Sequence, residues 1–308
     1  MILNKRIDRF NQHLLNTDDI QGRSLWHDAS RRFVRNKAAV AGLIVLVFIV
    51  IFTLVGPAFA KFSNEEIDWS VLGQIKTLGA PSFKTGHYFG TDELGRDLYA
   101  RVIQGTGISL SVGFIGSFVA VMVGTLYGAI SGYIGGRVDN FMMRLVDVFM
   151  SIPYMFVLIL LLVIFGRSIT MLFIGIGLVS WFDMSRIVRG QTLSIKNKEF
   201  IEAALAMGVP TFKIILRHIL PNLMGIVIVY ASLLVPGFIL AESFISFLGL
   251  GVQEPNTSWG ALISAGAKTM QYGTLWQIGF PLFFFTLTLF SLFFIGDGLR
   301  DALDPKDK

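Results

Sequence analysis

The stretch GISLSVGFIGSFVAVMVGTLYGAISGYI, residues 107–134, decides the fold class of this chain. Its 28 residues include no charged side chain, and about 20 such residues are enough for a helix to cross a bilayer. Small residues recur in it at every fourth position, on one helix face: Gly116, Ala120, Gly124, Gly128 and Gly132, with Gly136 just beyond. In lipid, such a ridge lets a second helix backbone approach closely. We therefore expect a spanning helix whose ridge packs within the chain, or forms a face that slides or pairs when the protein changes state.

Five further windows share this apolar, uncharged character. The 308 residues contain only 15% charged side chains and have a mean hydropathy of +0.65, as polytopic membrane proteins do. The six candidate spans are residues 38–60, 107–134, 148–166, 168–182, 219–241 and 269–296. The fourth is short, and it counts as a span because its helix can continue through Asp183 and Arg186, with Arg186 and Arg189 reaching the interface. The predicted fold is all-α with six transmembrane helices.

Basic residues predict the orientation of these spans. With alternating spans, 19 of the 26 Lys and Arg residues fall on the side that holds both termini, so both termini are expected in the cytoplasm and near anionic lipid. The expected segments are a basic cytoplasmic segment 1–37, a span 38–60, an outer loop 61–106, a five-helix core 107–296 containing a cytoplasmic loop 183–218 and an outer loop 242–268, and a tail 297–308. Within the first segment, Trp26, Ala29 and Phe33 have the spacing of a helix on the membrane surface.

The side chains that carry enzyme chemistry are scarce and scattered. The chain has no cysteine and four separated histidines, and it lacks H-E-x-x-H and G-x-S-x-G motifs, so we expect neither catalysis nor a metal or cofactor site. It also lacks the phosphate-binding G-x-x-x-x-G-K-[ST] motif. The ionisable residues Arg144, Asp147, Asp183 and Glu242 lie at span ends, where interfacial pairing is expected. Uphill transport would therefore need a motor in another chain.

The polar stretch EFIEAALAMGVPTFKIILRHILPN, residues 199–222, is the expected attachment point for such a motor. Gly208 predicts the end of a short helix, and Pro210 prevents its continuation. A second helix is expected from about Phe212, ending at Pro221 and running into the span 219–241. The first helix has apolar residues at i, i+3, i+4 and i+7: Phe200, Ala203, Ala204 and Met207.

This apolar face is thin at its middle, because Ala203 and Ala204 have small side chains. We expect both alanines to lie in a groove of a cytoplasmic partner, with Glu202 in polar contact at the edge. A simple interfacial connector is the alternative. A DNA-binding helix-turn-helix is disfavoured, because membrane spans tether the stretch on both sides, so no nucleic-acid partner is expected.

Several stretches resemble the permease subunits of ABC importers, in particular the peptide and nickel branch. Glu202, Ala203 and Ala204, followed by Gly208, are similar to the EAA coupling motif of these subunits. The other similar stretches are FGTDELGRDLYARVIQG (89–105), GISLSVG (107–113), WFDMSRIVRGQTLSIKNKEFIEAA (181–204) and FISFLGLGVQEPNTSWGALI (244–263). The resemblance extends over nearly the whole chain.

This resemblance implies a type I importer fold in a bacterial inner membrane. It implies a homologous second permease, two ATPases that bind ATP and magnesium, and a periplasmic binding protein that delivers peptides. It also implies an ATPase-coupling role for Glu202, Ala203, Ala204 and Gly208. Oligopeptides are the expected solute; dipeptides, murein peptides, glutathione and nickel are alternatives within the family. On composition alone, a self-sufficient secondary transporter or channel stays open.

Overall fold

The computed structural model describes residues 25–303, so residues 1–24 and 304–308 of the two predicted terminal segments lie outside the described part. Helices form most of the described chain. In order they are α2 (Leu25–Arg35), α3 (Lys37–Val55), η1 (Gly56–Phe59), α4 (Ile75–Leu78), α5 (Leu98–Ile134), α6 (Gly136–Met150), α7 (Tyr154–Phe165), α8 (Ile169–Ile195), α9 (Glu199–Ala206), α10 (Thr211–Ile214), η2 (Ile215–Ile219), α11 (Leu220–Phe247), α12 (Trp259–Thr269), η3 (Met270–Tyr272) and α13 (Trp276–Leu303).

Five of the described helical segments are long and apolar enough to cross a membrane. They are Lys37–Phe59, Leu98–Ile134, Ile169–Ile195, Thr211–Phe247 and Trp276–Leu303. The predicted span 148–166 is not one straight helix, because α6 and α7 meet at a bend of 74°. Pro153 lies in the bend with an extended ψ of 122°; it lacks an N–H, and it disfavours a helical conformation in the residue before it. Counted as one broken span, this pair completes the six that the sequence predicts.

Helix boundaries differ from the uncharged windows where caps and turns intervene. α5 begins nine residues before its window, because Asp97 caps it: the Asp97 carboxylate accepts a hydrogen bond from the Ala100 N–H at 2.9 Å. α13 begins at Trp276 instead of residue 269, because Gly273 makes a left-handed turn with φ of 81°. The prediction that the fourth helix continues through Asp183 is confirmed, since α8 extends to Ile195.

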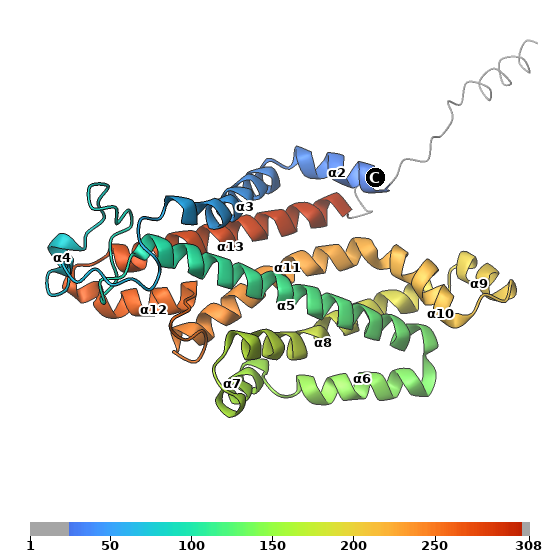
Figure 1. The fold of residues 1–308 in the computed structure, drawn as a ribbon. Helices are drawn as coiled ribbons and strands as arrows, with labels where there is room; N and C mark the ends of the chain where they lie inside the picture. The colour runs from blue at the N-terminus through green and yellow to red at the C-terminus, as the bar shows by residue number, and fades with distance from the viewer. Residues whose placement is uncertain (1–24, 304–308) are drawn as a thin grey trace, which may run out of the picture.

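Figure 1 shows α5 lengthwise in the middle of the bundle. α8 and α11 pack against α5, while α3 lies along α13. α4 and α12 lie at one end of the bundle, and α9, α10 and α2 lie towards the other. α2 packs on α13, where Ala29 is buried and Phe33 lies beside Gly298. The predicted membrane-surface helix therefore uses Ala29 and Phe33 for packing within the chain, and only Trp26 of the three is largely exposed.

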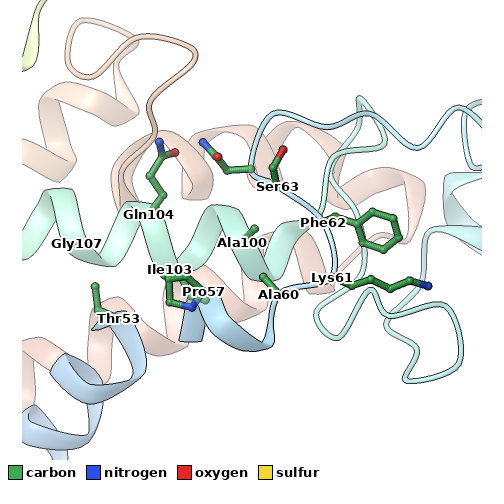
Figure 2. Close-up of a pocket in the computed structure, with 11 residues that line it drawn as sticks. Thr53, Pro57, Ala60, Lys61, Phe62, Ser63, Ala100, Ile103, Gln104 and Gly107 are labelled. Atoms are coloured by element: carbon green, nitrogen blue, oxygen red, sulfur yellow. The ribbon is translucent and has the colours of Figure 1, made fainter. Parts of the chain in front are cut away.

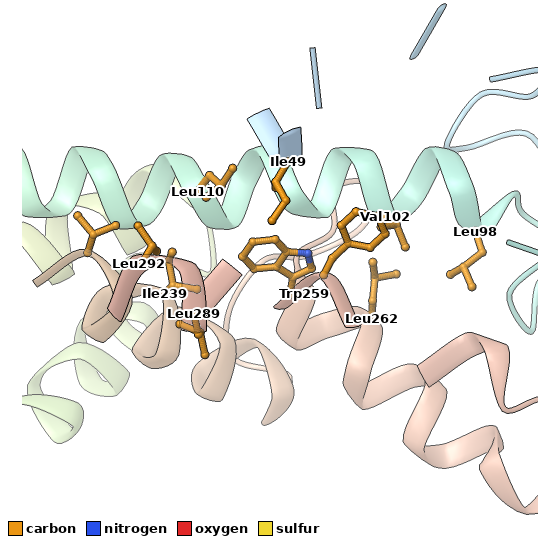
Figure 3. Packing of buried hydrophobic residues seen from close by; sticks show 11 residues of the cluster. Ile49, Leu98, Val102, Leu110, Ile239, Trp259, Leu262, Leu289 and Leu292 are labelled. Carbon is orange, nitrogen blue, oxygen red and sulfur yellow. The ribbon is translucent and has the colours of Figure 1, made fainter. Parts of the chain in front are cut away.

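A cluster of buried apolar side chains joins the helices towards the α12 end (Figure 3). Trp259, at the start of α12, is fully buried in it, and its indole N–H donates to the hydroxyl of Thr106 in α5 at 3.1 Å. The other labelled members come from α3, α5, α11, α12 and α13: Ile49, Leu98, Val102, Leu110, Ile239, Leu262, Leu289 and Leu292. The loop before α12 is thus anchored to the spanning helices.

Candidate functional site

The short helix α9 projects from the end of the bundle opposite α4 and α12 (Figure 1). Ile201 and Ala204, three residues apart, are its two buried residues, with 0% and 1% of their surfaces exposed. They pack in an apolar cluster with side chains from α8 and from the start of the α11 helix, including Met184, Val188, Ile214, Ile215, Ile219 and Leu223. α9 is therefore fixed to the two spanning helices between which it lies in the sequence.

Gly208 ends α9, as the sequence predicts, and it does so with a φ of +75°. The Gly208 N–H donates to the carbonyl of Leu205 at 2.9 Å, and the Val209 N–H donates to the carbonyl of Ala204 at 3.1 Å. These two bonds are the Schellman arrangement, which satisfies carbonyls that a helix end would leave unpaired. A side chain at position 208 would have free space but a strained backbone.

The predicted end of the second helix at Pro221 is wrong, whereas the prediction that this helix runs into a span is confirmed. The helical segment continues without a break from Thr211 to Phe247. Proline at 221 cannot donate to the carbonyl of Arg217 and clashes with it in a regular α-helix. The chain avoids this conflict with a π turn in η2, in which the Leu220 N–H donates to the carbonyl of Ile215. The helix that follows α9 is thus mechanically continuous with a spanning helix.

The four residues of the predicted apolar face of α9 do not share one environment, because three are exposed and Ala204 is buried. Ala203 is exposed, but Ala204 points into the chain's own apolar cluster, so it does not face a partner. The orientation follows from the apolar cluster that α8 and the start of the α11 helix offer, which Ile201 and Ala204 complete. The side that points away consists of exposed acidic and small residues, which we call the outward face: Glu199, Glu202, Ala203 and Ala206. Phe200, Leu205 and Met207, which flank it, expose 43%, 52% and 76% of their surfaces.

Charged side chains join α6 to α8 and α5. Arg189 of α8 makes two hydrogen bonds to the Asp139 carboxylate of α6, at 2.5 and 2.6 Å, and the Ser131 hydroxyl of α5 donates to the same carboxylate at 2.6 Å. Arg186 pairs with Asp147, which confirms the expected pairing of that acid. The two arginines therefore bind carboxylates of α6 instead of extending freely to the interface.

The small-residue ridge of α5 lies against α8. A Cβ added at Gly128 would lie 2.3 Å from the carbonyl oxygen of Ser185, and one at Gly132 would lie 2.8 Å from that of Arg189. Gly124 faces Met184 of α8 in the same way, Gly116 lies between Ile176 and Phe238, and Ala120 is fully buried. Gly136 does not extend the ridge, because it begins α6 with open space at its Cβ position.

At the opposite end, an ion-pair network joins the segment around the start of α5 to the loop between α11 and α12. Arg96 pairs with Asp92 at 2.7 Å and with Glu254 at 2.7 Å, and Arg101 pairs with Glu254 at 2.9 Å. Burial opposes ionisation of Glu254, but the hydrogen bonds from Arg101 and Arg96 outweigh it and lower the pKa of that carboxyl. Burial raises the pKa of Asp97, which lies 2.8 Å from the His87 ring. Sequence reasoning located both loops but missed this network, because its members are about 150 residues apart.

We expect the network to weaken in acid. Because the pKa of folded Glu254 lies below its ordinary value of 4.5, the contribution of its ion pairs is complete above that pH and is lost as the pH falls through the folded value. The Glu254→Gln variant should therefore show a smaller fall in melting temperature than the wild type when the detergent-solubilised protein is taken from pH 7 to about pH 4. The exposed Glu93 of the same loop provides a matched control, Glu93→Gln. An equal fall in wild type and Glu254→Gln would contradict the assignment.

Glu242 contradicts the expectation of interfacial pairing. Its side chain is fully buried in α11, and its carboxylate accepts hydrogen bonds from the hydroxyls of Ser109 at 2.9 Å, Ser246 at 2.7 Å and Ser243 at 3.2 Å. The Ser109 hydroxyl also accepts a hydrogen bond from the backbone N–H of Trp259 at 3.2 Å. Because buried carboxyl groups need such partners, Glu242 is a structural junction of α5, α11 and the loop before α12.

A hollow of about 560 Å³ lies between the end of α3 and the start of α5 (Figure 2). Thr53, Asn64 and Gln104 contribute polar groups to its lining, whereas the Lys61 ammonium donates to the carbonyl of Thr85 at 3.0 Å. The Gln104 amide donates to Asn256 at 3.3 Å, whereas its buried carbonyl oxygen has no partner within the described residues. Amide and hydroxyl groups of this kind can hydrogen-bond a peptide backbone. Across residues 25–303, no cluster of three or more acidic or histidine side chains could hold a metal ion.

Two family descriptions match the chain. Residues 124–307 match the family described as "Binding-protein-dependent transport system inner membrane component". Residues 24–74 match "N-terminal TM domain of oligopeptide transport permease C".

Curated relatives are similar over nearly their full lengths. The "Oligopeptide transport system permease protein OppC" of Haemophilus influenzae is 57% identical over 289 residues, which are 94% of this chain and 91% of that protein. The protein of the same name from Escherichia coli (strain K12) is 54% identical over 100% of both chains. The "Dipeptide transport system permease protein DppC" of Bacillus subtilis is 43% identical over 92% of this chain and 86% of that protein.

A solved structure is similar in fold. A chain of the MetNI methionine ABC transporter in an inward-facing conformation superimposes with a TM-score of 0.52 at 16% identity, covering 66% of this chain and 95% of that chain. At this identity the similarity concerns the arrangement of helices alone.

Proposed function

This chain belongs to the family of binding-protein-dependent transport system inner membrane components, and from that membership we propose that it is the permease subunit of an ATP-driven importer of oligopeptides. The family and the apolar helices make it a multi-pass inner membrane protein. The relatives named for oligopeptides from Haemophilus influenzae and Escherichia coli are 57% and 54% identical over nearly the whole chain, and this similarity supports oligopeptides as the solute. The two Bacillus subtilis relatives do not separate the solutes, because the one named for dipeptides is 43% identical and the one named for oligopeptides is 40% identical.

The observation that carries the proposal is the attachment of α9. Ile201 and Ala204 hold the helix on the bundle, while the outward face presents small and acidic residues to the surroundings. Ala203 and Ala206 permit close approach of a partner, and Glu199 and Glu202 can bind its basic or hydrogen-bonding groups. We assign this face to a cytoplasmic ATPase, with Gly208 ending the helix so that the next one can return to the membrane.

Movement of the ATPase would reach the pathway through rigid contacts. α9 shares its buried cluster with Val188 of α8 and Leu223 of α11, so a push on the outward face displaces two spanning helices together. ATP binding in two partner ATPases, which also hold the magnesium, must favour one conformation of the permease pair, since a ligand with equal affinity for both conformations shifts nothing. A homologous second permease completes the pathway, and hydrolysis resets it. The chain itself has no catalytic role in this scheme.

Delivery of solute is assigned to the opposite end. The hollow beside Gln104 lies among the outer elements, away from α9, and its polar groups suit a peptide released by a periplasmic binding protein. The end of α13 and the start of α2 lie towards the α9 end (Figure 1). This arrangement, together with the Lys and Arg distribution, supports cytoplasmic termini.

Reconstitution tests the proposal. Liposomes that contain this chain, a second permease, two ATPases and a binding protein are expected to accumulate oligopeptides with ATP, and liposomes that contain this chain alone are expected to show no uptake. A set with catalytically inactive ATPases is the matched control. Uptake by the chain alone would contradict the proposal in favour of a self-sufficient secondary transporter. ATP-dependent uptake of dipeptides, murein peptides, glutathione or nickel, without oligopeptides, would retain the importer and change its solute.

A further inference from the structure

A basic notch lies where α2, α3 and the end of α13 meet. It is a hollow of about 410 Å³ lined by Arg32, Arg35, Asn36, Asp301 and Ala302. None of the roles proposed above for α9 or for the outer end uses it. Its position, charge and shape together indicate a ligand.

The notch exists because the helix is interrupted at Asn36. The Asn36 N–H donates to the carbonyl of Phe33 at 3.0 Å, and its side-chain oxygen caps α3 by accepting from the N–H groups of Ala38 and Ala39 at 3.1 and 3.2 Å. Across from it, Gly298 of α13 is so close to Ala39 that an added Cβ would lie 2.3 Å from that side chain. α3 and α13 are therefore in close contact beside the notch, and the notch itself is lined by the long basic side chains of Arg32 and Arg35.

Among the described residues, the lining of the notch carries more positive than negative charge. Two arginines and one acid line it. Two further exposed basic residues, Arg31 and Lys37, lie next to the lining residues in the sequence. The acid, Asp301, has its carboxylate 3.5 Å from the amide nitrogen of Asn36. Guanidinium groups present parallel N–H donors that match the oxygens of a phosphate. The chemistry of the rim thus suits a phosphodiester.

The location decides what kind of phosphodiester can be present. The apolar spanning segment begins at Lys37, directly after the notch. Leu43 and Val47, which lie 7 and 11 residues after Asn36 and so share its helix face, expose 42% and 47% of their surfaces. Clusters of basic residues at the membrane end of a spanning helix attract anionic lipid. We propose that the notch binds the headgroup of an anionic phospholipid, with its acyl chains along Leu43 and Val47.

Lipid binding by the purified full-length protein tests this inference. Native mass spectrometry would compare phosphatidylglycerol with phosphatidylcholine of identical acyl chains, and we expect tighter binding of phosphatidylglycerol. Arg35→Gln should weaken binding of phosphatidylglycerol about fivefold, and the further change Arg32→Gln should weaken it by a similar factor. Arg137→Gln, which neutralises an exposed arginine at the start of α6, is the matched control and should have no effect.

A variant with the opposite expected effect separates lipid binding from misfolding. Asp301→Asn removes the acid from the notch and should tighten binding of phosphatidylglycerol, which a damaged fold would not do. Equal affinity for the two lipids, or unchanged binding in Arg35→Gln, would overturn the inference. Displacement of phosphatidylglycerol by an equal concentration of inorganic phosphate would assign the notch to a free anion and would also overturn it. None of these outcomes depends on the transported solute.

Discussion

Replacing Ala204 with glutamate is expected to abolish peptide uptake by detaching α9 from the bundle. Ala204 has only 1% of its surface exposed and lies among apolar side chains of α8 and α11. An unpaired carboxylate there costs several kcal/mol, so the helix would leave its place. We expect the melting temperature of the isolated permease to fall, uptake by the assembled importer to drop at least tenfold, and the ATPases to be lost on purification.

The neighbouring alanine separates docking of α9 from contact with the ATPase. Ala203→Glu changes an exposed residue of the outward face, so the isolated permease should melt as the wild type does, while attachment of the ATPase weakens and uptake falls. Ala204→Ser is the control, because serine is nearly as small as alanine and carries no charge. This variant should keep α9 in place. If Ala204→Glu left the melting temperature unchanged, the inward position of Ala204 would be refuted; if Ala203→Glu retained full uptake, the ATPase would have to bind elsewhere.

The second large effect is expected at Gly128, where α5 and α8 are in closest contact. A Cβ at this position would lie 2.3 Å from the carbonyl oxygen of Ser185 and 2.9 Å from the Val188 side chain. The backbone of α8 has little freedom to move away, because Arg189 is held by Asp139. Since overpacking typically costs about 1–3 kcal/mol, and a backbone atom cannot rotate aside, Gly128→Val should reduce the yield of folded protein and lower its melting temperature sharply.

A glycine on the same pair of helices provides the control for this prediction. Gly190 of α8 has open space at its Cβ position and is exposed. Alanine favours the helix more than glycine does, by up to about 1 kcal/mol. Gly190→Ala should therefore leave the melting temperature unchanged or raise it. If Gly128→Val melted like the wild type, or if Gly190→Ala were as damaging as Gly128→Val, close packing of the ridge would be ruled out as the cause.

Local sequence predicted the positions of helices better than their ends. The uncharged windows identify the spans, because lipid admits few charges whatever the tertiary structure. The ends depend on single residues: Asp97 extends α5 backwards by capping it, and Gly273 delays the start of α13. Pro153 and Pro221 show why proline alone is ambiguous. The first lies at a bend of 74°, whereas the π turn before the second lets the helix continue.

The sequence likewise predicted where α9 lies in the chain, but not which of its faces packs against the bundle. Two apolar stripes compete on α9, one through Ala203 and one through Ile201 and Ala204, and a helix of eight residues is too short for periodicity to choose between them. The choice depends on the apolar cluster offered by α8 and α11. Glu242 is similar: its position at the end of a span suggests an interfacial charge, but it is fully buried and accepts hydrogen bonds from three serines of α5 and α11.

The sequence by itself determined that this chain crosses a membrane several times, that α9 lies between two spans and ends at Gly208, and that small residues line one face of α5. These properties follow from hydrophobicity, helix period and backbone conformation, which act over a few residues. Only the tertiary structure decided that Ala204 faces inward, that the ridge packs on α8, and that Arg101 reaches Glu254. Each of these is a contact between segments distant in sequence, and its partner is fixed only when the helices pack together.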